Sequence, residues 1–178
     1  MIRGEIKGFR RNVCVDGVGM EIEFDVKIDG GVLYDYMLHH TYTSAQGLLG
    51  TGVGALMIVA FAMQHSVIFL IAGIVILGYL PWTLFIKSRQ QALMTPAFKK
   101  PLHYMLDEEG ITVSQDESEE KQEWGQMYKA ISTNRSIIVY TSRVNASIFP
   151  KKDLGDNKAK VIEIISTHMP PAKVKIRG

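Results

Sequence analysis

Residues 47–86 read GLLGTGVGALMIVAFAMQHSVIFLIAGIVILGYLPWTLFI, and this stretch decides the fold class of the chain. No Asp, Glu, Lys or Arg occurs between Asp35 and Lys87. A charged residue at the centre of a bilayer costs about 2.5–3.5 kcal/mol on insertion scales, whereas a water-soluble domain interrupts its apolar runs with charged surface positions. The stretch therefore predicts a hairpin of two membrane-spanning helices.

Two helices are needed because about twenty residues already span the hydrocarbon core of a bilayer. The polar residues Gln64, His65 and Ser66 divide the stretch into helices over residues 47–63 and 67–86, and His65 is expected to cap the turn. Thirteen residues of the second helix are Val, Ile, Leu or Phe, so it should insert unaided. The first helix contains more glycine and depends on its partner, and Pro81 is expected to kink or stop the second helix.

Two glycines of the first helix predict a helix-packing face. Gly50 and Gly54 have the four-residue spacing that lets two helix backbones approach closely. The alternative is a phosphate-binding loop, which needs a Lys-Ser or Lys-Thr pair after its last glycine. Ala55 and Leu56 follow instead, so packing is the favoured interpretation.

Basic residues after the second helix predict the orientation of the hairpin. No acidic residue precedes Asp107 on this side, and excess Lys and Arg mark cytoplasmic segments. Because a hairpin returns the chain to its starting side, both termini are predicted to be cytoplasmic in a multi-pass protein of the inner (plasma) membrane. Tyr42, Tyr79 and Trp82 are expected to anchor the helices at the inner interface. The basic residues are Lys87, Arg89, Lys99 and Lys100.

Length and composition bound the rest of the chain. With the hairpin removed from the 178 residues, enough remains for one small soluble domain. The net charge of +2 and the scattered basic residues argue against nucleic acid as a partner. Cys14 is the single cysteine, which excludes an intramolecular disulfide and suits a reducing cytosol. No signal peptide is expected, because the first thirty residues alternate charged and apolar positions.

The segment before the hairpin, residues 1–46, is predicted to be cytosolic. Residues 1–20 suggest one or two weak strands, and residues 21–28 alternate apolar and charged side chains as in a half-buried strand. A helix is expected over residues 32–43, leading into the membrane.

The segment after the hairpin divides into a basic connector, residues 87–102, and a β domain, residues 103–178. Short strands are predicted at residues 103–106, 111–114, 123–128, 136–141 and 146–149. Asp107 to Gly110 form the first turn, with glycine at a position that favours positive φ. A helix over residues 157–169, capped by Asp156, closes the domain, and the last seven residues are expected to be loose. The predicted class is therefore an α+β membrane protein: a transmembrane hairpin and a small antiparallel β domain with a C-terminal helix.

Four motifs of the chain resemble the YcxB-like family of small bacterial membrane proteins. They are FDVKIDGGVLYDYMLHH (residues 24–40), LDEEGI (106–111), EWGQMYKAIS (123–132) and SIFPKKDL (147–154). The resemblance covers nearly the whole chain from residue 21 and implies a C-terminal domain similar to a pleckstrin-homology domain. It implies no reaction or ligand, and Trp124 is interpreted as a core residue.

Candidate sites are few. Asp35 and His39 share a helical face, but two ligands are too few for a metal and His40 points elsewhere, so no metal or cofactor is predicted. The acidic run at residues 116–120 is interpreted as a solvated loop. Four lysines could contact lipid headgroups, at about 1 kcal/mol for each basic residue near an anionic surface. They are Lys151, Lys152, Lys158 and Lys160.

Hydrolase, metalloprotease and nucleotide-binding motifs are absent from the sequence, so an enzyme is not expected. The first hypothesis is a membrane-anchored interaction module that presents its cytosolic domain to a protein partner or to lipid headgroups. The alternative is an accessory or self-associating subunit of a transporter or pore, in which the Gly50 and Gly54 face packs against other copies.

Overall fold

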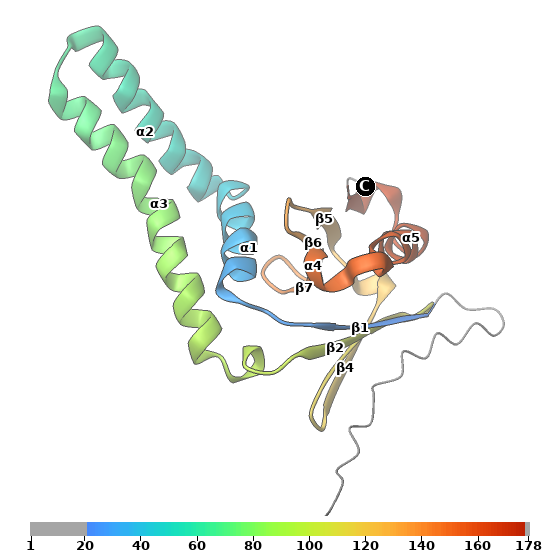
Figure 1. Cartoon of the computed structure of the whole chain (residues 1–178). Coiled ribbons are helices and arrows are strands. Elements are labelled where there is room, and N and C mark those ends of the chain that lie inside the picture. Colours follow the sequence, from blue (N-terminus) through green and yellow to red (C-terminus); the bar gives the residue numbers. More distant parts are fainter. Residues whose placement is uncertain (1–20, 177–178) are drawn as a thin grey trace, which may run out of the picture.

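The computed structural model describes residues 21–176 (Figure 1). The weak strands predicted within residues 1–20, and Cys14, lie outside the described residues. An α-helical hairpin extends from a domain of two β-sheets, so the α+β class with apolar helices and antiparallel sheets is confirmed.

The first sheet joins segments that lie on either side of the helices in the sequence. Its order is β1 (Ile22–Val26), β2 (Leu102–Leu106), β3 (Gly110–Gln115) and β4 (Ser118–Glu123), all antiparallel. Phe24 pairs with Tyr104 across the β1–β2 ladder. Strand β1, which precedes the helices, therefore shares one sheet with strands that follow them, and the helices are an insertion between β1 and β2.

The second sheet has the order β7 (Ala146–Pro150), β6 (Ser136–Tyr140), β5 (Lys129–Ser132) and β8 (Val174–Lys175). Strand β8 pairs with β5 in parallel, so residues 172–175, which were predicted to be loose, are ordered in η4 (Pro171–Lys173) and β8, while residues 177 and 178 lie outside the described residues. Helix α4 (Lys151–Leu154), η3 (Gly155–Asn157) and α5 (Lys158–His168) follow β7. The predicted terminal helix is thus confirmed, but its N-cap is Asn157, not Asp156, and the side chain of Asn157 accepts no hydrogen bond from the first turn.

One hydrophobic core fills the space between the two sheets and α5. Phe24 and Tyr104 from the first sheet both meet the ring of Phe149 from β7, with ring centroids 5.3 and 4.9 Å apart. Val161 and Ile165 of α5 are completely buried against the same core. The alternation of apolar residues in β1 places every second side chain inside.

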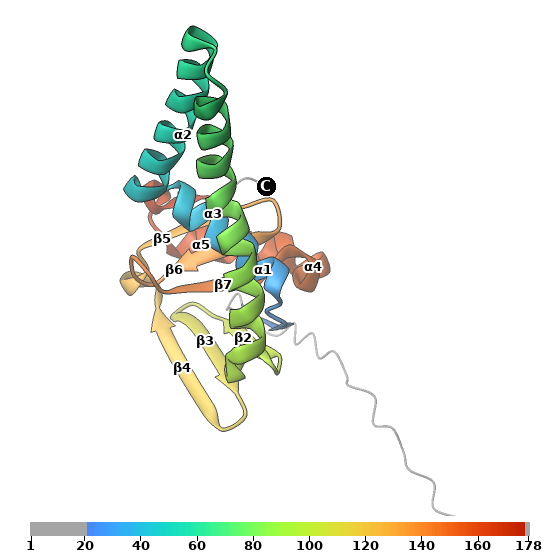
Figure 2. The same ribbon diagram turned by 90° about the vertical axis from the view of Figure 1, so that its left-hand side faces the viewer.

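Three helices follow β1. Helix α1 (Gly30–Tyr42) begins at Asp29, whose Oδ1 accepts a hydrogen bond from the N–H of Val32 at 2.8 Å. Helix α2 (Ala45–Gln64) follows after two residues, and α3 (Val67–Met94) returns antiparallel to it. Figure 2 shows α2 beside the first part of α3, whose remainder continues beyond the start of α2 alongside α1. His65 forms the turn as the C-cap of α2 with φ of 54°, which confirms its capping role.

The returning helix is longer than predicted. It passes through Pro81 and ends at Met94, so the first half of the expected connector at residues 87–102 is helical, and η1 (Pro96–Phe98) lies in its second half. At 1.5 Å per residue the 28 residues of α3 span about 42 Å, against about 30 Å for a hydrocarbon core. The last residues of α3 therefore continue past the apolar segment as a stalk beside α1.

The hairpin exposes its apolar side chains. Among residues 21–176, eighteen of the twenty exposed large hydrophobic residues lie on α2 and α3, including Tyr79 and Trp82. Both helices are long and apolar enough to cross a membrane, and only 11% and 6% of their most apolar windows are buried inside the protein. The core helix of a soluble protein would show the opposite pattern.

Three local predictions of the β domain need correction. The acidic run at residues 116–120 is not a loop: Asp116 and Glu117 form a two-residue turn, and β4 begins at Ser118. The strand predicted at residues 123–128 is instead η2 (Trp124–Gln126). Gly110 does not have the positive φ that was predicted for this turn. Glycine is needed there because a Cβ would lie 2.1 Å from the carbonyl oxygen of Gln122.

Candidate interaction surfaces

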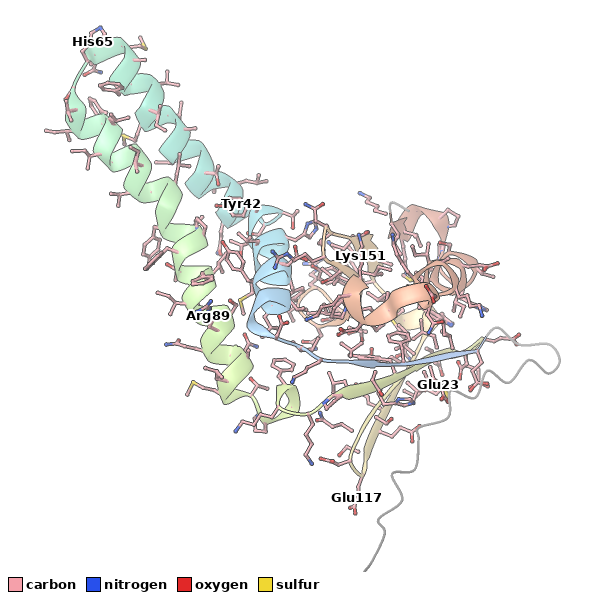
Figure 3. All side chains as sticks on the ribbon, viewed as in Figure 1. Glu23, Tyr42, His65, Arg89, Glu117 and Lys151 are labelled. Atoms are coloured by element: carbon pink, nitrogen blue, oxygen red, sulfur yellow. The ribbon has the colours of Figure 1, made fainter. Side chains whose placement is uncertain are left out.

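The stalk formed by α1 and the end of α3 fixes the β domain against the apolar hairpin. The rings of Tyr34 and Phe85 meet edge to face with centroids 5.7 Å apart. The guanidinium carbon of Arg89 lies 4.4 Å from the centroid of Phe85. A Cβ on Gly30 would lie 3.3 Å from the Cγ of Arg89, so the two helices approach closely at this point. Figure 3 shows Arg89 and Tyr42 along this stalk.

The C-terminal half of α1 packs against the second sheet through aromatic rings. Tyr36 and His40 both lie against Tyr140 of β6, with ring centroids 6.1 and 6.3 Å apart. The ammonium of Lys129 lies 4.6 Å from the centroid of Tyr140, within the range of a cation–π contact. The hydroxyl of Tyr36 donates to the carbonyl oxygen of Val144 at 3.1 Å. These contacts bring the start of β5 and the β6–β7 loop close to the junction of α1 and α2.

This junction borders a basic and aromatic surface, which we call the junction face and define by Tyr128, Lys129, Arg143 and Val144. Tyr128 is 48% exposed and Val144 is 69% exposed, and they are the two exposed large hydrophobic residues outside α2 and α3 in residues 21–176. Residues 124–152 contain five Lys or Arg and no Asp or Glu. Sequence reasoning missed this face, although the acid-free stretch would have indicated it.

Charge of the opposite sign gathers on β3, β4 and the turns beside them. Residues 107–123 contain eight Asp or Glu against one Lys. That lysine, Lys121, bridges Asp107 at 3.1 Å and Glu109 at 2.5 Å, and Lys100 pairs with Asp116 at 2.8 Å. The β3–β4 hairpin projects from the domain away from the α2–α3 turn (Figures 1 and 2), and Glu117 and His65 lie at opposite ends of the molecule (Figure 3). We call residues 107–123 the acidic pole.

An open hollow of about 580 Å³ lies beside the acidic pole. Its floor is Trp124, which is 5% exposed, stacks on the ring of His168 at 5.7 Å and donates its indole N–H to the carbonyl oxygen of Asp107 at 2.9 Å. The prediction that Trp124 is a core residue is therefore confirmed. Three carboxylates surround the hollow, from Glu108, Glu109 and Glu123.

The structure does not bring the four predicted lysines together. Lys152 pairs with Asp29 at 2.6 Å, and Lys151 donates to the carbonyl oxygen of Thr133 at 2.5 Å, so both ammonium groups have partners within the chain. Burial raises the pKa of Asp29, but the ammonium of Lys152 and the N–H of Val32 lower it by more, and the net pKa lies below the usual value. Lys158 and Lys160 lie on α5, on the side of the domain away from α1 (Figure 1).

The proposed glycine face is occupied within the hairpin. A Cβ on Gly54 would lie 2.7 Å from the Cγ of Leu77, and a Cβ on Gly50 would lie 3.6 Å from a methyl of Leu80. Both glycines therefore face α3 of the same chain. A Cβ on Gly52 would have no neighbour within 4 Å, so this glycine faces outward.

The residues considered as metal ligands have other partners. Asp35 accepts a hydrogen bond from the hydroxyl of Thr133 at 2.5 Å, and His40 stacks on Tyr36. Burial lowers the pKa of His39, and the positive charge of Lys129 lowers it further. Within residues 21–176, no group of three His, Cys, Asp or Glu side chains could hold a metal ion.

Comparison with known families agrees with the sequence motifs. The family model described as YcxB-like protein matches residues 106–165, from the end of β2 to α5. The motifs at residues 106–111, 123–132 and 147–154 lie inside the match, and the motif at residues 24–40 lies outside it. Neither curated proteins nor solved structures gave a match.

Proposed function

We propose that this chain, whose residues 106–165 form a YcxB-like region, is a non-enzymatic interaction module anchored in the inner membrane by α2 and α3. Its cytosolic β domain presents the acidic pole to a basic segment of a protein partner. Both termini lie on the cytosolic side in this proposal, and His65 lies at the outer surface.

The apolar exterior of the hairpin supports the anchor. An exposed apolar surface that covers α2 and most of α3 is incompatible with a water-soluble monomer but is expected in lipid, where every backbone polar group is satisfied within the helix. Lys87 and Arg89 follow the apolar segment on the side of the β domain, which the positive-inside rule assigns to the cytosol. Exposed Tyr79 and Trp82 lie on α3 shortly before these residues, as interfacial anchors do.

The β domain supports a binding role similar to that of pleckstrin-homology domains. The first sheet is antiparallel throughout, and the second is antiparallel except where β8 pairs with β5. The two sheets enclose one core, which α5 closes, and the family resemblance implies such an arrangement. Binding on such a scaffold is carried by its exposed loops and edges, which a rigid core holds in place.

The observation that carries the proposed partner is the position of the acidic pole. It projects from the end of the domain farthest from the α2–α3 turn (Figure 3), where an inner-membrane protein meets the cytosol. Its edge strand β4 has exposed side chains at five of six positions, and four of the six are charged. A surface with this net charge attracts basic segments and repels the anionic leaflet.

Photo-crosslinking of the full-length protein in native membranes tests the partner. A benzophenone amino acid at Ser118 should give a discrete protein adduct, and Glu117→Lys with Glu119→Lys should abolish it. Glu21→Lys with Glu23→Lys, at the start of the same sheet, makes the same change in net charge and should leave the adduct intact. An adduct that survives reversal of Glu117 and Glu119 contradicts the proposal.

A further inference from the structure

The junction face is the second distinctive surface of the β domain, and its composition is unusual for a surface that faces water. An exposed tyrosine and an exposed valine flank two cations, Lys129 and Arg143. Among the described residues, no carboxylate lies within 4.0 Å of either cation. The ammonium of Lys129 is instead held over the rings of Tyr140, at 4.6 Å, and Tyr128, at 6.0 Å.

The contacts of α1 set the depth of this face. His40, whose ring meets Tyr140, precedes the first residue of α2, Ala45, by five positions, and only residues 43 and 44 separate the two helices. The polar region of one leaflet is roughly 5–8 Å thick, since the whole bilayer measures about 40–45 Å and its hydrocarbon core about 30 Å. Leu48 is the first exposed large hydrophobic residue of α2 and marks the entry of the apolar segment into the hydrocarbon. The junction face, a few residues earlier along the helices, then lies at or just below the level of the headgroups.

We propose that the junction face rests on the inner leaflet and binds anionic phospholipid headgroups. Lys129 and Arg143 contact the phosphates, while Tyr128 and Val144 enter the boundary between headgroups and acyl chains. Tyrosine suits this position because its ring is apolar and its hydroxyl is polar. The inference rests on the membrane anchor of the proposed function and goes beyond it by assigning the lipid class and the residues.

This assignment differs from contact through the four lysines of α4 and α5. Two of those lysines bind Asp29 and Thr133, and the other two lie on the side of the domain away from α1. The molecule is thus polarised, with the basic junction face near the leaflet and the acidic pole away from it. An anionic leaflet attracts the first and repels the second, which favours one orientation of the domain.

Lipid-selective fluorescence quenching tests the proposal on the full-length protein. A Cys14→Ser, Asn145→Cys variant carries a fluorophore at the exposed end of the β6–β7 loop, next to Val144. The protein is reconstituted in vesicles of phosphatidylcholine and phosphatidylglycerol, with a nitroxide quencher attached to one lipid or to the other in parallel samples. The ratio of the two quenching efficiencies gives the relative affinity of the face for the anionic lipid.

Quenching by labelled phosphatidylglycerol should exceed quenching by labelled phosphatidylcholine. Each basic residue near an anionic surface contributes about fivefold, so Lys129→Gln with Arg143→Gln should reduce the relative affinity by up to roughly thirtyfold. Lys158→Gln with Lys160→Gln removes the same charge from α5 and should change nothing. Because Lys129 packs on Tyr140, the exposed Arg143→Gln alone provides a second variant that leaves the core intact and should give about a fivefold loss.

Equal quenching by the two lipids, an equal loss in the α5 variant, or no quenching by either lipid would overturn the proposal. The membrane anchor is assessed separately in the same samples, because an anchored protein floats with the vesicles whether or not the fluorophore is quenched. Failure of the lipid site and failure of the anchor are therefore distinguishable.

Discussion

Replacing Gly54 by alanine tests whether α2 and α3 pack as one unit. The added methyl would lie 2.7 and 2.8 Å from the Cγ and Cδ2 of Leu77 and 3.2 Å from the Cγ2 of Ile76. Carbon atoms in contact prefer about 3.5–4.0 Å, so Leu77 or the whole of α3 must move. Overpacking of this kind costs roughly 1–3 kcal/mol.

Gly52→Ala is the matched control. It lies on the same helix, two residues away, and its methyl would have no neighbour within 4 Å. Both variants gain the same helix propensity of about 1 kcal/mol over glycine, so the difference between them isolates the packing cost. Gly54→Ala should therefore be less stable than Gly52→Ala by about 2 kcal/mol.

Energy transfer measures the separation of the two helices. Trp82 on α3 serves as donor and a dye on Gln46→Cys as acceptor, in a Cys14→Ser, Trp124→Phe background that leaves Trp82 as the single tryptophan. The full-length protein is titrated from mild detergent into sodium dodecyl sulfate. Gly54→Ala should lower the midpoint and Gly52→Ala should not. Equal midpoints for the two variants would refute close packing of α2 on α3 at Gly54.

Three further predictions concern the β domain of the full-length protein in mild detergent. Gly110→Ala places a methyl 2.1 Å from the carbonyl oxygen of Gln122 and should lower the free energy of unfolding, measured by urea titration, by roughly 3 kcal/mol. Gly125→Ala, whose methyl would have no neighbour within 4 Å, should leave it unchanged. Burial raises the pKa of Tyr104 to about 12 from an unfolded value near 10, so the unfolded chain loses this proton at lower pH. This residue should therefore lower the stability by about 2 kcal/mol between pH 10 and pH 12; a flat pH profile contradicts this. Asp29→Ala removes the N-cap of α1 and should cost about 1 kcal/mol by thermal unfolding, and an unchanged midpoint would show that the cap contributes nothing.

The apolar hairpin was predictable because its signal is long and local. Forty residues without a charge fix two helices and a turn, and His65 marks that turn in both sequence and structure. The end of α3 was not predictable from hydropathy, because residues 87–91 are polar and basic and remain helical through packing against α1. Tertiary contacts thus extended an element beyond its apolar segment.

The strands were predictable only where one side faces the core. The alternation in β1 was visible, but its pairing with β2 spans the whole helical insertion and no local signal reports it. Strand β4 reads SEEKQE, which is typical of a solvated loop, since a charged edge strand with exposed side chains lacks an apolar period. Strand β8 is two residues long and depends on β5 for its hydrogen bonds.

The candidate surfaces were partly visible in sequence. Gly54 was correctly placed at a helix contact, which proves to be within the chain. The lysines could not be ranked, because their pairing with Asp29 and Thr133 depends on partners more than 15 residues away. The junction face combines the start of β5 with the β6–β7 loop, so only the folded chain brings its residues together and places them beside α1.

Membrane topology is most directly measured by labelling single cysteines in intact cells. In a Cys14→Ser background, His65→Cys lies at the turn of the hairpin and Glu117→Cys at the tip of the acidic pole, at opposite ends of the molecule (Figure 3). A membrane-impermeant maleimide should label His65→Cys in intact cells and Glu117→Cys only after permeabilisation. Labelling of Glu117→Cys in intact cells, or recovery of the protein in the supernatant after ultracentrifugation without detergent, would contradict an inner-membrane hairpin that carries a cytosolic β domain.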